Sequence, residues 1–147
     1  MNKRSQTEWV VSGVVEAPIE KVWEVLLDAN PLSSTDKSDI FHADESEIYK
    51  TSTGKPGEGK ITIEVDKKHH SIAIQGEWWY RGVHTVEAHE RGSLLVYRIY
   101  NVAPGGTWWL AQLVQGPEAA RGMRKTLQDL LNTMGARLDC KTILLPD

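Results

Sequence analysis

The chain has 147 residues, which suffices for one domain with a complete hydrophobic core. Its 17 basic and 20 acidic residues nearly balance, and no basic run is longer than a pair such as Lys67 and Lys68, so the charge pattern favours neither nucleic acid nor an anionic membrane surface as a partner. No stretch has the length and apolarity of a membrane span. Cys140 is the only cysteine, which excludes an internal disulfide and is typical of a reducing compartment. We therefore predict a single domain over residues 1–147, located in the cytoplasm.

The N-terminal segment predicts a strand followed at once by a helix. Glu8–Val15 is rich in β-branched and aromatic residues, which favours a strand. Pro18 suits the first turn of a helix, and apolar residues recur at helical spacing before the chain reaches Pro31. In the Ser- and Asp-rich segment Pro31–Ala43 we expect a loop with one weak helical turn around Leu32–Lys37. The apolar positions of the helix are Ile19, Val22, Trp23 and Leu26.

From Glu45 the hydrophobic period changes to two, which predicts antiparallel strands in hairpin succession. Glycine-rich or proline-rich turns separate them, among them Thr53–Gly59, and Gly76 is expected to mark a bulge or a bend. The strands predicted in this way are Glu45–Thr51, Lys60–Asp66, Ser71–Gln75, Trp78–His89, Ser93–Val102 and Thr107–Gln115. For Thr107–Gln115 a helical start stays open as an alternative.

A long amphipathic helix is predicted over Pro117–Leu138. Gly116 and Pro117 supply the N-cap and the first helical position. Burying the apolar stripe of this helix contributes on the order of 10 kcal/mol gross, so the helix must dock on the strands. The stripe contains Met123, Leu127, Leu130, Leu131, Met134 and Leu138. The elements follow in the order strand, short helix, meander of strands and terminal helix. This order predicts an α+β fold.

Three pieces of the sequence carry a resemblance to a known group. The segment Val14–Asn30 has the sequence VVEAPIEKVWEVLLDAN. It resembles the segment of the SRPBCC superfamily in which the first strand ends, a helix starts at an Ala-Pro pair, a Val-Trp pair follows and the helix ends with Leu-x-Asp. TGKPGEGK at 53–60 resembles its glycine-rich turn between the second and third strands, and the terminal helix lies in the expected place. This superfamily includes START lipid-transfer domains, the major birch-pollen allergen and bacterial polyketide cyclase/dehydrase-like proteins.

The resemblance implies a helix-grip fold, in which a curved antiparallel sheet of about six to seven strands wraps around the long C-terminal helix. One or two short helices would follow the first strand. It also implies an elongated apolar cavity between sheet and helix, and hence a hydrophobic ligand of lipid, aromatic or polyketide-like type. An empty cavity of about 300 Å³ would cost about 7 kcal/mol, so the space should be occupied or filled by the chain's own rings.

The chain has six tryptophans and one phenylalanine, and large rings are enriched where proteins hold ligands or partners. Strand alternation allows only one of two adjacent rings to point inward. On this basis Trp78 is expected inward and Trp79 outward, and Trp109 inward and Trp108 outward. The alternative is that the inward rings only fill the core. The predicted ligand-binding residues are Trp78, Tyr80, His84, Tyr97, Trp109, Met123, Leu127, Leu130 and Met134.

His84 and Tyr97 are the polar groups expected to reach the cavity. They would orient a ligand carbonyl or hydroxyl, or move protons in a polyketide cyclase or dehydratase-like reaction, or His84 would be an ordinary hydrogen-bonded core histidine. We assign no catalytic residue beyond these two candidates. A third hypothesis is a protein-interaction module, resembling helix-grip domains that activate a heat-shock chaperone, with Trp79 and Trp108 as anchors.

Two other patterns predict no site. Gly54–Lys60 has the spacing of a phosphate loop, but Ile61 replaces the magnesium-binding Ser or Thr, and a strand follows in place of a helix. His69 and His70 diverge on a tight turn, and no metal-binding spacing occurs. We therefore expect neither a metal nor a cofactor.

Overall fold

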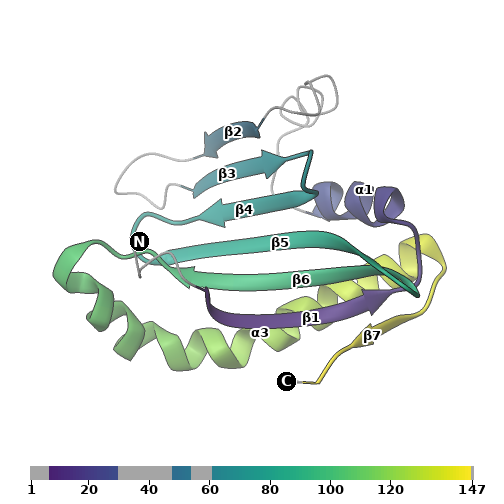
Figure 1. The fold of residues 1–147 in the computed structure, drawn as a ribbon. Coiled ribbons are helices and arrows are strands. Elements are labelled where there is room, and N and C mark those ends of the chain that lie inside the picture. Colours follow the sequence, from purple (N-terminus) through teal and green to yellow (C-terminus); the bar gives the residue numbers. More distant parts are fainter. Residues whose placement is uncertain (1–6, 30–47, 54–60, 147) are drawn as a thin grey trace.

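The computed structural model describes residues 7–29, 48–53 and 61–146. Seven antiparallel strands in these residues form one sheet with the order β2-β3-β4-β5-β6-β1-β7, and the long helix α3 crosses one face of it (Figure 1). The predicted α+β helix-grip class is therefore confirmed. The elements are β1 (Thr7–Val15), α1 (Ile19–Ala29), β2 (Ile48–Thr53), β3 (Ile61–Asp66), β4 (Ser71–Gln75), β5 (Tyr80–His89), β6 (Gly92–Asn101), the 3-10 turn η2 (Gly105–Thr107), α3 (Trp108–Leu138) and β7 (Thr142–Leu144).

Alternation along the strands makes the face toward α3 apolar. In β6 the buried side chains Leu95, Tyr97 and Ile99 point to this face, and Arg98 and Tyr100 point to the other. Strand β5 pairs with β6 along its whole length, with His84 opposite Tyr97. Strand β1 lies on the other side of β6, so the three longest strands, β5, β6 and β1, are neighbours in the sheet.

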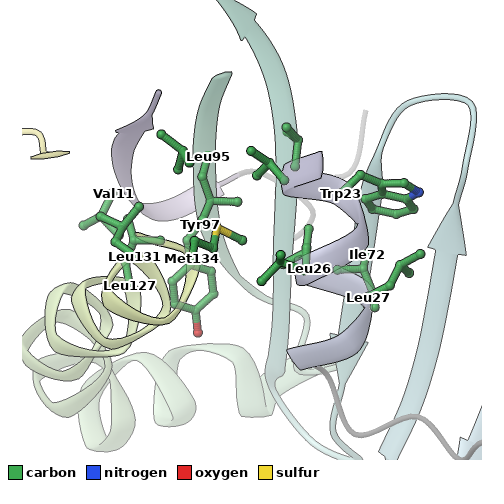
Figure 2. Packing of buried hydrophobic residues seen from close by; sticks show 14 of the residues in the cluster. Val11, Trp23, Leu26, Leu27, Ile72, Leu95, Tyr97, Leu127, Leu131 and Met134 are labelled. Carbon is green, nitrogen blue, oxygen red and sulfur yellow. The ribbon is translucent and has the colours of Figure 1, made fainter. Parts of the chain in front are cut away.

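The core lies between this face, the second half of α3 and α1. Figure 2 shows Leu127, Leu131 and Met134 of α3 near Tyr97, and α1 residues near Ile72. The helix approaches β1 closely at Gly13, because a Cβ at this position would lie 2.6 Å from Leu131 Cδ1. Glycine at position 13 therefore lets α3 pack directly on the sheet.

The prediction of a strand at Thr107–Gln115 is wrong, because α3 begins at Trp108 and continues through Pro117. The aromatic residues of this segment suggested a strand, but Leu, Ala and Gln are good helix formers, and Val114 is its only β-branched residue after Thr107. Asn101 also ties the start of the helix to the sheet, since its Nδ2 donates a hydrogen bond to the Trp108 carbonyl at 3.0 Å.

Other boundaries differ in smaller ways. Strand β5 begins at Tyr80, two residues later than predicted, because residues 77–79 form a bend. The short strand β7 pairs with β1 and was not predicted. The predicted loop Pro31–Ala43, with its helical turn at Leu32–Lys37, and most of the turn Thr53–Gly59 lie outside the described residues. In the described parts of the chain, no helix is long and apolar enough to cross a membrane.

Candidate ligand-binding groove

A groove of about 400 Å³ lies between the sheet and the middle of α3, beside the start of β5. Its sheet side is formed by large rings and one aliphatic side chain, and its helix side by small residues, one methionine and one glutamate. The described residues that line it are Trp79, Tyr80, Tyr97 and Ile99 from the sheet side and Glu118, Ala119, Gly122, Met123 and Thr126 from α3. Apart from the tyrosines, Glu118 is the only ionisable side chain among them.

Two tyrosine hydroxyls form the polar centre of this groove. Tyr80 comes from β5 and Tyr97 from β6, and their hydroxyl oxygens are 2.5 Å apart in a hydrogen bond. The Tyr80 ring lies over Gly82, where an added Cβ would lie 2.7 Å from Tyr80 Cζ and still nearer to its hydroxyl. Glycine at position 82 therefore provides the space in which the Tyr80 ring reaches Tyr97.

Both phenols stay protonated at neutral pH. Burial raises the pKa of Tyr80, and burial together with the neighbouring Tyr80 raises the pKa of Tyr97. A neutral phenol both donates and accepts a hydrogen bond. The pair therefore offers a ligand an uncharged hydrogen-bonding group in a largely apolar setting.

His84 lies behind Tyr97 and does not line the groove. The two rings are stacked with centroids 4.3 Å apart and an angle of 7° between their planes, and the histidine is 8% exposed. Neither Nδ1 nor Nε2 has a hydrogen-bond partner among the described residues. Burial lowers the pKa of His84 to about 4, so its ring is neutral at neutral pH.

Small residues on one face of α3 create the open space opposite the tyrosines. Ala119, Gly122, Met123 and Thr126 follow the spacing i, i+3, i+4 and i+7, so they share one face of the helix. A Cβ at Gly122 would meet nothing within 4 Å. Ala119, Gly122 and Thr126 were not among the predicted ligand-binding residues, because the prediction rested on large apolar side chains, although the helical spacing of these small residues is visible in the sequence.

Of the predicted ligand-binding residues, Tyr80, Tyr97 and Met123 line the groove. Leu127 and Met134 are fully buried in the core, and Leu130 packs against it. These three residues belong to the packing around the groove and not to its lining.

The predicted facing of both tryptophan pairs is wrong. Trp78 is 37% exposed and Trp109 is 60% exposed. Trp79 instead packs on the core and lines the groove. The bend before β5 exchanges the inward and outward positions that regular strand alternation would give to Trp78 and Trp79. Trp108 is half-buried and its Nε1 is enclosed, since helical geometry replaces the expected strand. The partner anchors expected at Trp79 and Trp108 are therefore not exposed surfaces.

Comparisons with solved structures identify the fold. No family model matches the sequence, and a search of curated proteins finds no match. The polyketide cyclase-like protein Cgl2372 from Corynebacterium glutamicum superposes with a TM-score of 0.54 at 11% identity, covering 88% of this chain and 91% of that one. The protein TTHA0849 from Thermus thermophilus gives 0.51 at 14% identity, covering 88% and 99%. At such identities the likeness concerns architecture alone, and it confirms the helix-grip fold of this chain.

Proposed function

We propose that the protein binds a hydrophobic small molecule of lipid, aromatic or polyketide-like type, without covalent chemistry, in the groove between the sheet and α3. The observation that carries this proposal is the groove itself. Its volume of about 400 Å³ lies in the usual range of small-molecule sites, and its lining is mainly apolar around one pair of hydrogen-bonding phenols. A helix-grip architecture supports the same conclusion at the level of fold. We propose further that the protein acts in the cytoplasm.

The second candidate is a polyketide cyclase or dehydratase-like enzyme. The Tyr80–Tyr97 pair favours it, because a phenol can polarise a substrate carbonyl or pass a proton to it. His84 does not favour it, since its ring nitrogens are enclosed behind Tyr97. Binding without turnover on polyketide-like substrates would separate the first candidate from this one.

The third candidate, a protein-interaction module, has a different surface from the one expected. Trp109, Leu110, Leu113 and Val114 are exposed on the first turns of α3, away from the groove. Substituting Trp109 and Leu113 would test this surface without touching the groove. Loss of a co-purifying protein in that variant would favour the module.

The groove can be tested by filling it. In Gly122→Leu the new side chain enters space that is empty around position 122, so we expect ligand binding to be lost while the helix keeps its fold. Ala136→Leu places the same side chain on an exposed position of α3 outside the groove and serves as the matched control. Native mass spectrometry of protein purified from its own host measures the bound molecule, and solvent extraction identifies its class.

We expect a stoichiometric small apolar adduct in the wild type and in Ala136→Leu, and a bare mass in Gly122→Leu. A bare wild-type mass, with no thermal shift from a panel of lipids and aromatic compounds, would refute the proposal. An adduct that persists equally in Gly122→Leu would place the ligand elsewhere on the protein.

A further inference from the structure

We propose that the groove selects ligands whose polar end is an uncharged oxygen acceptor, such as a ketone, ester or quinone oxygen, and rejects carboxylates and phosphates. This inference rests on the proposed binding function and specifies the ligand class. It follows from the hydrogen-bonding capacity of the Tyr80–Tyr97 pair and from the charges around the groove.

The tyrosine pair has one proton left to donate. Two phenols carry two O–H groups, and the hydrogen bond between Tyr80 and Tyr97 uses one of them, whichever hydroxyl is the donor. The remaining O–H is available to a third group, and in the groove that group is a ligand oxygen. A ligand with an acceptor oxygen next to an apolar body therefore satisfies the pair, while a pure hydrocarbon leaves the O–H without a partner.

The described charges around the groove disfavour an anion. Its lining contains no Lys or Arg among residues 61–146, and its one carboxylate, Glu118, repels negative charge. The basic side chains of α3 between residues 118 and 126 form other contacts: Arg121 Nε donates to the Pro117 carbonyl at 3.3 Å, Arg124 Nη1 donates to the Leu145 carbonyl at 3.2 Å, and Lys125 pairs with Asp129 at 3.1 Å. An anionic headgroup would therefore lose its hydration without gaining a cation.

The histidine behind the pair supplies no charge either. His84 is enclosed, has no hydrogen-bond partner in the described part of the chain and stacks flat on the Tyr97 ring. A neutral imidazole in this place supports the ring by packing and offers no positive charge for an anion. The described lining and the histidine behind it thus offer an anion no positive charge, and the one charged side chain of the lining is the carboxylate of Glu118.

Three naphthalene probes of similar size test the inference: ethylnaphthalene, acetylnaphthalene and naphthoate. Titration calorimetry at neutral pH gives their dissociation constants. We expect the ketone to bind about 3- to 10-fold more tightly than the hydrocarbon, which is the effect of one additional hydrogen bond. We expect naphthoate to bind at least about tenfold more weakly than the ketone, because its charge is buried without a partner.

The variants separate the hydroxyls from the rings. A single substitution leaves one phenol with a free O–H, so the test uses the double variant Tyr80→Phe/Tyr97→Phe, which keeps both rings and removes the whole pair. We expect it to lose the preference for the ketone and to bind ethylnaphthalene at least as tightly as the wild type does, because no O–H is left without a partner. Tyr100→Phe, on the opposite face of the sheet, is the control and should retain the preference.

The outcomes are distinguishable. If the three probes bind with equal affinity, or if naphthoate binds most tightly, the inference is overturned while the proposed binding function stands. If the double variant keeps the preference for the ketone, the tyrosine pair is not its source and the inference is also overturned. If none of the probes binds, the inference is overturned, and the wild-type mass and the thermal-shift panel decide separately whether the proposed function stands.

Discussion

The two ends of the contact between α3 and the sheet are built from the same elements but have different properties. At the closed end, Leu131 and Met134 of α3 meet Leu95 of the sheet and Leu26 of α1, and all four are fully buried. At the open end, nearer the start of α3, alanine and glycine face the tyrosine pair and leave the groove. The comparison shows that the size of the helix side chains decides whether this contact becomes core or binding site.

A substitution at the closed end should have the largest effect. Leu131→Ala removes a fully buried side chain that packs against Gly13, and we expect it to lower the free energy of unfolding by about 4 kcal/mol. Urea denaturation measures this loss. Leu113→Ala, at a position of α3 that is 68% exposed, should change stability by less than about 0.5 kcal/mol. Equal effects at the two positions would show that the closed end is not the core.

His84 connects the two ends, because it is buried like the closed end but stacks on a tyrosine of the open end. Burial lowers its pKa from 6.5 to about 4, so between these values the unfolded chain binds a proton that the folded chain does not. Stability should therefore fall as pH falls through this window, by about 3 kcal/mol for this residue.

The variant His84→Phe keeps a ring against Tyr97 and should lack this part of the pH dependence. Urea unfolding at neutral pH and near pH 4 measures the difference between the two proteins. If the wild type and His84→Phe lose the same free energy of unfolding between neutral pH and pH 4, His84 is protonated in the folded state.

The smallest change is expected at the open end. A methyl group in Gly82→Ala would occupy the space of the Tyr80 hydroxyl, so we expect the ring to move away from Tyr97 at a cost of about 1–3 kcal/mol. Thermal unfolding measures the cost, and ultraviolet difference spectra of the phenols report the change in their environment. A Cβ at Gly106 would meet nothing within 4 Å, so Gly106→Ala should leave the thermal unfolding and the phenol spectra unchanged. Spectra that stay the same in Gly82→Ala would contradict the packing described for Tyr80.

Periodicity predicted most of the fold, because long elements repeat their pattern often enough to be recognised. Strand β1, helix α1, strands β3 to β6 and the second half of α3 are found close to their predicted bounds. The first turns of α3 were predicted as a strand with a helical start as the alternative, and the alternative is the one found, since the Leu, Ala and Gln that follow Trp108 and Trp109 favour a helix. The three residues of β7 are too few to show a period.

The candidate site was predicted less well than the fold. Tyr80, Tyr97 and Met123 were expected to line the space between sheet and helix, and they do. The bend before β5 changed which of Trp78 and Trp79 packs on the core, because strand alternation is reversed by a shift of one residue. The space itself comes from Gly122, which has no side chain. A search for large apolar side chains does not find such a residue.

Trp79 also gives the protein an internal optical reporter. Its indole lines the groove and meets Trp9 and Tyr80 edge to face, with ring centroids 6.3 Å and 5.5 Å away. A molecule that enters the groove removes water from this indole, so its fluorescence should move to shorter wavelength without any attached dye. The difference between the emission of the wild type and that of a Trp79→Phe variant isolates this signal from the other five tryptophans.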